Sequence, residues 1–200
     1  QFGPSEDFER YPRDFERDRA LAEAAGVDLL FHPESAEMYP AGYRTYVTVE
    51  GLSERLCGRF RPGHFRGVAT VVSKLFHLVQ PRRAYFGQKD AQQVAVLRKM
   101  VRDLDFDLEI VVCPTVREPD GLALSSRNVY LSPAERQAAT VLSRALSWAK
   151  ERVQEGERQA AVLLAGMQRI LEAEPLCRLE YLEVVDAENL EPLAHLGGDV

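Results

Sequence analysis

The stretch RAYFGQKDAQQVAVLRKMVRDLDFDLEIVV (Arg83–Val112) gives the strongest indication of the fold. Arg83–Phe86 reads as a short strand that runs into Gly87, and Ala91–Leu104 reads as a helix because its apolar residues recur at helical spacing on one face. Leu108–Val112 is an apolar run of strand length, interrupted only by Glu109, and such a run is typical of a buried parallel strand. A strand, a helix and a second strand in this order predict a parallel sheet with a right-handed crossover.

The segments upstream continue the alternation of helix and strand. Asp14–Ala25 and Gly67–Val79 are expected to be helices, the second stopped by a following proline. Two strands are expected between them, at Val27–Phe31 and at Tyr43–Val49, where apolar, aromatic and β-branched residues gather. The sequence therefore predicts the α/β class for this part of the chain.

The last part of the chain has a different character. Ser132 and Glu135 form the sequence pattern of a capping box at the start of a long helix, Pro133–Gln154. We therefore expect a domain boundary near residue 114, with the parallel sheet in residues 1–114 and a smaller α+β domain in residues 115–200. The other elements expected in the second domain are a helix at Arg158–Glu172 and a strand at Leu179–Val185.

Composition excludes several classes of protein. A formal net charge of -6 argues against a general nucleic-acid binder, although a small anionic ligand is still compatible. The longest apolar-leaning run, Val68–Val79, is interrupted by polar residues and is too short to span a bilayer, so no membrane partner is expected. Cys57, Cys113 and Cys177 are far apart and odd in number, which fits neither a disulfide framework nor a zinc site.

Two polar loops carry the residues suited to chemistry. Gly87–Asp90 (GQKD) directly follows a strand, and ligands of parallel sheets bind beyond the carboxyl ends of the strands. Ser125, Ser126 and Arg127 place two hydroxyl donors beside a planar cation, which suits a phosphate. The alternatives are a solvated surface ion pair for the lysine and aspartate of the first loop and ordinary turn chemistry for the serines.

Five blocks resemble a known family in order and in spacing. They are QFGPSEDFERYPR, EGLSERLCGRFRPGHFRGVATVVSKLF, YFGQKDAQQ, PTVREPDGLALSSRNVYLSPAER and LEYLEVVD, and together they cover nearly all of the chain. They resemble the pantothenate synthetases, the pantoate–β-alanine ligases of coenzyme A biosynthesis. The resemblance implies a Rossmann-like domain that binds ATP and pantoate, closed by the smaller α+β domain. It also implies ATP-dependent condensation of pantoate with β-alanine through a pantoyl adenylate, with release of AMP and pyrophosphate, Mg²⁺ as cofactor and a cytoplasmic homodimer.

The resemblance also implies roles for individual residues. Lys89 and the residues of the Ser125–Arg127 motif are implied to be catalytic, at the ATP phosphates. Gln93 is implied to bind pantoate, and Gln1 to contact pantoate and β-alanine. The implied ATP-binding residues are Gly87, Gln88, Lys89, Asp90, Val116 through its backbone, Leu124, Ser125, Ser126 and Arg127.

The chain departs from the family's pattern at two residues and at both ends. Gln88 stands where the family usually has glutamate, and Leu124 stands where methionine is common. Because a strand and an ATP-binding loop of the family precede Gln1, and further strands follow Val200, we expect a fragment that binds ATP poorly and is inactive by itself. The rival interpretations are a non-catalytic nucleotide-binding fragment and adenylyl transfer to another small acid.

Three smaller expectations concern residues outside the implied site. His64, in RPGH, is expected to shape the loop before a helix rather than to act as a ligand or a base. Gln92 is expected to be an exposed helix residue. Glu6 and Asp7 are expected to form a solvated face.

Overall fold

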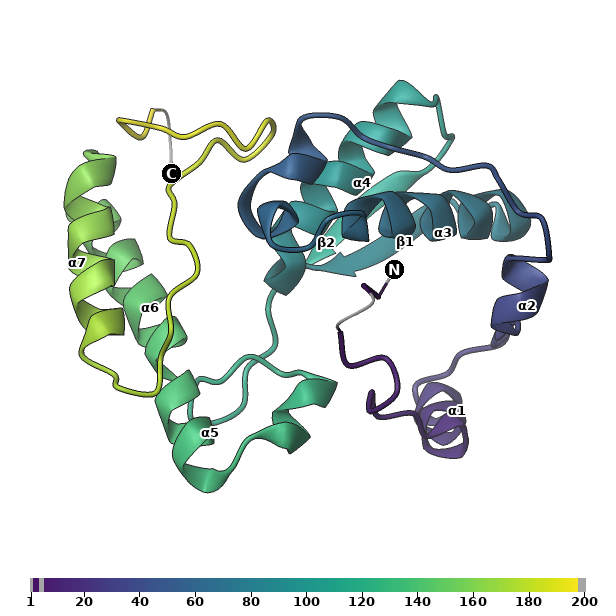
Figure 1. The fold of residues 1–200 in the computed structure, drawn as a ribbon, viewed down its shortest axis with the longest axis horizontal. Helices are drawn as coiled ribbons and strands as arrows, with labels where there is room; N and C mark the ends of the chain where they lie inside the picture. The colour runs from purple at the N-terminus through teal and green to yellow at the C-terminus, as the bar shows by residue number, and fades with distance from the viewer. Residues whose placement is uncertain (1, 4–5, 198–200) are drawn as a thin grey trace.

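The structure is a computed structural model, and it describes residues 2–3 and 6–197 of the chain (Figure 1). These residues bury apolar side chains in two separate cores, one around a small parallel sheet and one between helices nearer the C-terminus. No helix in the described part of the chain is long and apolar enough to cross a membrane.

The predicted strand, helix and strand form the centre of the first core. They are β1 (Arg83–Gly87), α4 (Ala91–Asp103) and β2 (Glu109–Cys113). The two strands are parallel, and Tyr85 lies opposite Val111 in their register. The predicted parallel pairing is therefore confirmed. The chain passes from the end of β1 directly to the start of α4.

Helix α3 (His64–Val79) covers this unit. Val68 of α3 and Leu97 and Met100 of α4 are almost completely inaccessible to solvent. Burying a side chain of this size stabilises the fold by about 1.5–3 kcal/mol. The helix ends where the sequence predicts, because Pro81 cannot continue it.

The N-terminal helix agrees with the sequence pattern. It is α1 (Phe15–Ala24), and the Asp14 carboxylate caps it by accepting a hydrogen bond of 3.0 Å from the backbone N–H of Arg17. A short helix that was not expected, α2 (Ser35–Met38), follows it.

The two strands predicted between α1 and α3 are not formed. Residues 27–31 and 43–49 are without regular secondary structure, and the sheet of the described residues consists of β1 and β2. A strand needs a ladder partner, and neither segment has one here. The backbone N–H of Val47 instead donates to the Thr70 hydroxyl at 3.0 Å.

The long helix predicted after residue 132 is two helices, α5 (Pro133–Ala139) and α6 (Val141–Gln154). The capping box at Ser132 is confirmed at the start of α5. The break falls at Thr140, whose hydroxyl donates to the Gln137 carbonyl at 2.7 Å and so competes with the helical backbone pattern.

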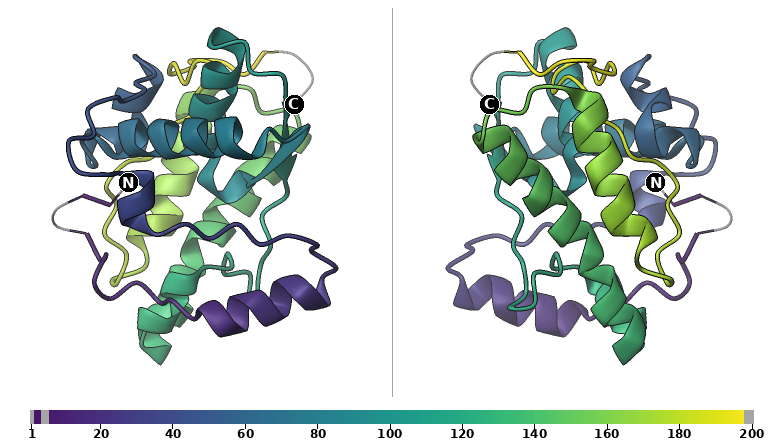
Figure 2. Two further views of the ribbon diagram at one scale, coloured as in Figure 1. Left: turned by 90° about the vertical axis from the view of Figure 1, so that its right-hand side faces the viewer. Right: turned by 90° about the vertical axis from the view of Figure 1, so that its left-hand side faces the viewer.

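Helix α7 (Ala160–Glu172) packs on α6 to form the second core, and Figure 2 shows the two helices side by side. Their close approach requires Gly166, because a Cβ there would lie 1.8 Å from the Trp148 ring. The strand predicted at 179–185 is not formed, and Val185 makes only an isolated bridge to Pro192.

The chain after α7 returns to the first core. Leu190 is buried there, and the Arg55 guanidinium forms an ion pair of 3.1 Å with Glu191. This segment, yellow in Figure 1, therefore connects the two cores from the side opposite to the β2–α5 connection.

Candidate active site

A cavity of about 440 Å³ opens where β1 ends and α4 begins. Its wall comes from the N-terminal segment, the loop before α3, the start of α4, the turn after β2 and one residue beyond α7, Tyr181. This is the end of a parallel sheet at which ligands bind. The sequence-predicted residues that line it are Lys89, Asp90, Gln93 and Arg127.

The start of α4 gives this cavity a positive side. Lys89 and Asp90 lie in a short 3₁₀ turn, η3 (Gln88–Asp90), directly before the helix. Asp90 is at the N-cap position, as expected, but its side chain makes no capping hydrogen bond. The Lys89 Nζ donates to it at 3.4 Å instead. The positive end of the helix dipole and the Lys89 ammonium group therefore act on the same space.

Two adjacent glutamines of α4 have different surroundings. Gln93 is half-buried in the cavity wall, and the described part of the chain offers its amide no hydrogen bond. The expectation that Gln92 is exposed is wrong, since it is 7% exposed. Its amide oxygen accepts from the backbone N–H of Cys57 at 3.1 Å, and its amide nitrogen donates to the carbonyls of Leu52 at 2.8 Å and Arg55 at 2.7 Å.

These hydrogen bonds fix one wall of the cavity. The wall consists of two 3₁₀ turns, η1 (Leu52–Glu54) and η2 (Leu56–Arg59), of which Leu56 and Cys57 line the cavity. The turns approach each other so closely that a Cβ on Gly58 would lie 2.0 Å from the Ser53 carbonyl oxygen. A side chain at this position would force the wall to move.

Arg127 is held at the cavity by the N-terminal segment. Its Nε and Nη2 donate to the two carboxylate oxygens of Asp7 at 2.7 and 2.8 Å. The guanidinium carbon also lies 5.0 Å from the ring centroid of Tyr11 and 5.6 Å from that of Phe2. Because Arg127 hydrogen-bonds the charged form of Asp7, the pKa of this carboxyl falls to about 2.

A second bidentate pair lies beside the first. Arg61 donates to both carboxylate oxygens of Glu6 at 2.6 and 2.7 Å, which lowers the pKa of Glu6 to about 2. The expectation that Glu6 and Asp7 form a solvated face is therefore wrong. Neighbouring carboxylates of one segment bind two arginines of one cavity, and no local sequence signal joins positions so far apart.

The RPGH segment contributes side chains to the cavity wall as well as forming the loop before α3. His64 begins α3, and its Nε2 lies 3.0 Å from Arg61 Nη1. Both side chains line the cavity. The clustered basic residues of RPGHFR were the signal that could have placed them in the site.

The turn after β2 carries the other predicted residues. A small hairpin joins Val116 to Leu124, whose backbone N–H donates to the Val116 carbonyl at 2.9 Å, and the two side chains are 66% and 58% exposed. The Ser125 hydroxyl accepts from the Arg127 backbone N–H at 3.3 Å and so caps η4 (Ser126–Tyr130). The predicted residues that are not among the described lining residues are Gly87, Gln88, Val116, Leu124, Ser125 and Ser126. Gln1 lies outside the described residues.

No built cation site is present in the described residues. None of their histidine, cysteine, aspartate and glutamate side chains gather in threes as a metal cage would require. Asp90 is the carboxylate among the residues that line the cavity. Mg²⁺ is commonly held by one or two carboxylates together with substrate phosphates, and this donor set fits only that mode.

Comparison with known proteins identifies the family of this chain. Residues 1–199 match the family model described as pantoate-beta-alanine ligase. The chain is 60% identical over 200 residues to the pantothenate synthetase of Moorella thermoacetica and 58% identical over 200 residues to that of Acetivibrio thermocellus. Each alignment covers 100% of this chain and 71% of the relative.

Two solved structures are similar in fold. The crystal structure of pantothenate synthetase from Thermus thermophilus superposes with a TM-score of 0.95 at 57% identity, over 98% of this chain and 71% of that one. The pantoate-beta-alanine ligase of Francisella tularensis, solved in complex with beta-gamma ATP and beta-alanine, has a TM-score of 0.67 at 32% identity. That alignment covers 82% of this chain and 61% of the other.

Proposed function

The chain belongs to the pantoate-beta-alanine ligase family, whose activity is the synthesis of pantothenate, and on this premise we propose that the cavity at the start of α4 is where ATP activates pantoate. The observation that carries this proposal is the set of positive groups around one cavity. Lys89, Arg61 and Arg127 line it together with the N-terminus of α4. Such an arrangement suits a triphosphate, whose charge several fixed donors must share.

The reaction has two group transfers. A carboxylate oxygen of pantoate forms a bond to the α-phosphorus of ATP, and the bond from this phosphorus to the β-phosphate oxygen breaks, so that pyrophosphate leaves. The amine of β-alanine then attacks the acyl carbon of pantoyl adenylate and loses a proton, and AMP leaves with the electron pair of the broken C–O bond. Both steps depend on positioning and on stabilising the negative charge of the phosphates.

The residues of this chain divide these tasks. Lys89 stabilises charge on the transferring phosphates, and Arg127 with the hydroxyls of Ser125 and Ser126 grips the rest of the triphosphate. The remaining ATP contacts in this proposal come from backbone and small side chains at the ends of β1 and of the hairpin. They are Gly87, Gln88, Asp90, Val116 and Leu124.

Side-chain amides are proposed to bind pantoate. Gln93 lies in the cavity wall without a hydrogen bond from the described residues, and an amide can both donate to a hydroxyl and accept from one. This dual capacity suits a hydroxy acid. Gln1 is proposed to contact both pantoate and β-alanine.

The N-terminal segment competes for the proposed phosphate donors. The Asp7 carboxylate accepts hydrogen bonds from the Nε and Nη2 of Arg127. A phosphate oxygen needs the same donors, so Asp7 moves away when the triphosphate binds.

Magnesium is proposed to accompany ATP. Asp90 is the residue that would hold it, as an exposed carboxylate at the cavity, with phosphate oxygens and water completing the shell. The ion would neutralise part of the phosphate charge.

The remaining proposals concern the molecule as a whole. Residues 1–114 are proposed as a Rossmann-like domain for ATP and pantoate, and residues 115–200 as the smaller α+β domain that closes over ATP. The separate core between α6 and α7 supports this division, while Leu190 of the second range is buried in the first core. The protein is proposed to be a homodimer and to lie in the cytoplasm. Its free cysteines suit that reducing compartment.

Replacing Lys89 tests the proposed activation step. In the full-length enzyme, Lys89→Ala should lower pantoate-dependent exchange of pyrophosphate into ATP by roughly 10² to 10³, which corresponds to a loss of ~3 to 4 kcal/mol of transition-state stabilisation. The matched control is Lys99→Ala, in the helix that follows Lys89, where the lysine pairs with Asp103 and does not line the cavity. A Lys89→Ala rate within about threefold of the control would contradict the role.

A further inference from the structure

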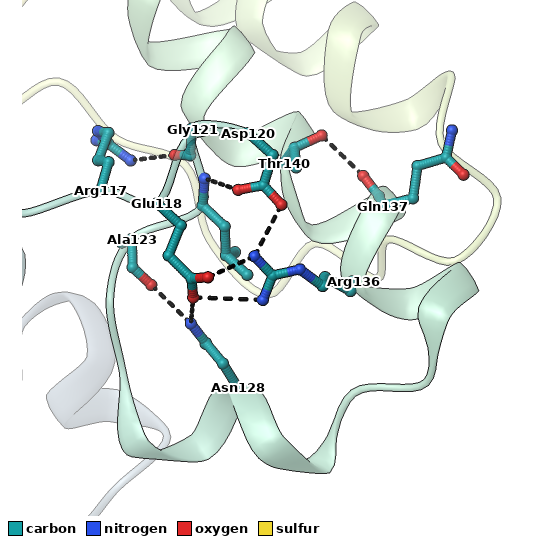
Figure 3. A network of polar contacts seen from close by, with 10 residues as sticks. Arg117, Glu118, Asp120, Gly121, Ala123, Asn128, Arg136, Gln137 and Thr140 are labelled. Carbon is teal, nitrogen blue, oxygen red and sulfur yellow. Dashed lines mark hydrogen bonds and ion pairs between the residues drawn. The ribbon is translucent and has the colours of Figure 1, made fainter.

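A cluster of polar side chains lies next to the Ser125–Arg127 turn, and the proposed reaction gives its members no role. Figure 3 shows it between the hairpin, η4 and α5. Its centre is Glu118, in the first arm of the hairpin. The carboxylate accepts a hydrogen bond of 2.6 Å from Arg136 Nη2 and one of 3.0 Å from Asn128 Nδ2.

Each partner of Glu118 ties a different segment to the hairpin. Asn128 directly follows Arg127, and its amide also donates to the Ala123 carbonyl at 3.1 Å. Arg136 belongs to α5 and reaches a second hairpin carboxylate, that of Asp120, at 2.9 Å. One carboxylate thus joins the hairpin, the turn after it and the next helix.

The turn is largely exposed on the side of the hairpin, so side-chain hydrogen bonds set its position relative to the hairpin. Ser126 and Arg127 are exposed, and Leu124, which precedes them, points its side chain to solvent. Three backbone hydrogen bonds hold the hairpin itself, from Glu118 to Leu122, from Gly121 to Glu118 and from Leu124 to Val116. The side-chain cluster therefore holds the turn to the hairpin and to α5, while Asp7 holds Arg127 from the N-terminal segment.

The donors around Glu118 stabilise its charged form. The pKa of Glu118 is lowered because Arg136, and then Asn128, donate hydrogen bonds to its charged form. The pKa of Arg136 is raised by the same contact. The carboxylate therefore stays ionised at neutral pH and keeps both donors.

We propose that Glu118, held in place by Arg136, is a positioning residue for ATP binding. Glu118 acts through Asn128 on the Ser125–Arg127 turn. Glu118 touches no substrate in this proposal. It sets the direction from which Arg127 and the two serines approach the triphosphate. The inference rests on the proposed role of Arg127 as a triphosphate ligand.

Steady-state kinetics of the full-length enzyme, with the concentrations of ATP and pantoate varied separately, provide the first test. Glu118→Ala should lower kcat/KM for ATP by about 10- to 100-fold, because a displacement of about 1 Å in a positioned group has effects of this size. The KM for pantoate should stay within about twofold, because Gln93 belongs to a different element. Glu155→Ala removes the carboxylate of an unrelated ion pair with Arg152 and should leave both substrates unaffected.

A double-variant cycle with Arg127→Ala separates positioning from general damage. If Glu118 acts through the turn, Glu118→Ala should have little further effect once Arg127 is alanine. Additive losses in the double variant, or equal losses for ATP and pantoate, would overturn the inference. Arg127→Ala without any effect on ATP use would instead overturn the proposed function of Arg127.

A second variant covers the case in which Glu118→Ala does not fold. Arg136→Lys keeps the positive charge but removes the fork that reaches Glu118 and Asp120 together. It should also raise the KM for ATP selectively, while the thermal unfolding midpoint changes little. An unchanged KM for ATP in this variant would contradict the proposal.

Discussion

Replacing Gln92 with leucine tests whether one buried amide holds the cavity wall to α4. Leucine is of similar size to glutamine but has no donor and no acceptor. The amide accepts from the Cys57 N–H at 3.1 Å and donates to the carbonyls of Leu52 at 2.8 Å and Arg55 at 2.7 Å. Since the side chain is buried, water has little access to the groups that would lose it.

The structure allows the effect to be sized. The Arg55 carbonyl keeps a hydrogen bond of 2.8 Å from the Gly58 N–H, whereas the Cys57 N–H and the Leu52 carbonyl lose the partner that the structure shows for them. A buried backbone group left unpaired costs about 1–3 kcal/mol, so the two together should lower the free energy of unfolding by about 2–6 kcal/mol. In a chain of this size, that corresponds to a fall of roughly 5–20 °C in Tm.

Thermal and urea unfolding, followed by circular dichroism, would measure this loss. The matched control is Gln93→Leu, the same chemical change at the next residue, where the described chain offers the amide no hydrogen bond. We expect the control to unfold within about 2 °C of the wild type. Equal shifts in the two variants, or a Gln92→Leu variant within about 0.5 kcal/mol of the wild type, would show that packing alone holds the wall.

Two further predictions concern the substrate and acid pH. Gln93→Ala should weaken pantoate use by ~1 to 3 kcal/mol with little effect on ATP use, and equal losses for both substrates would mean that Gln93 only supports the loop. Because Arg61 and Arg127 lower the pKa values of Glu6 and Asp7 to about 2, these pairs stabilise the folded segment above the ordinary values of 4.5 and 3.8 and lose this effect as the pH falls toward 2. The Tm difference between the wild type and a Glu6→Gln, Asp7→Asn double variant should therefore shrink between about pH 5 and pH 2, and a difference independent of pH would refute the ion-pair explanation.

Local sequence patterns predicted those elements whose stabilising contacts are themselves local. The helix at α4 follows from its apolar spacing, and the start of α5 follows from the Ser132 capping box. The exact course of the second long helix did not follow, because it depends on a junction at Thr140, where the threonine hydroxyl bonds the Gln137 carbonyl between α5 and α6. Sequence patterns did not distinguish that choice from an ordinary helical threonine.

The strands show the opposite case. Val27–Phe31, Tyr43–Val49 and Leu179–Val185 have strand-like composition, but composition does not supply a ladder partner. Of the predicted strands, those that became β1 and β2 found one in each other. The pairing of strands is a property of the assembled chain.

The candidate site divides in the same way. Residue types at the end of β1 and after β2 can be read from the sequence, and they predict the phosphate chemistry expected of Lys89 and Arg127. Only the tertiary structure decided that Gln92 is buried while Gln93 lines the cavity, because neighbouring helix positions face different directions and packing selects between them. It also decided that Glu6 and Asp7 bind Arg61 and Arg127, since an ion pair between residues far apart in the chain exists only once folding has brought both charges to one place.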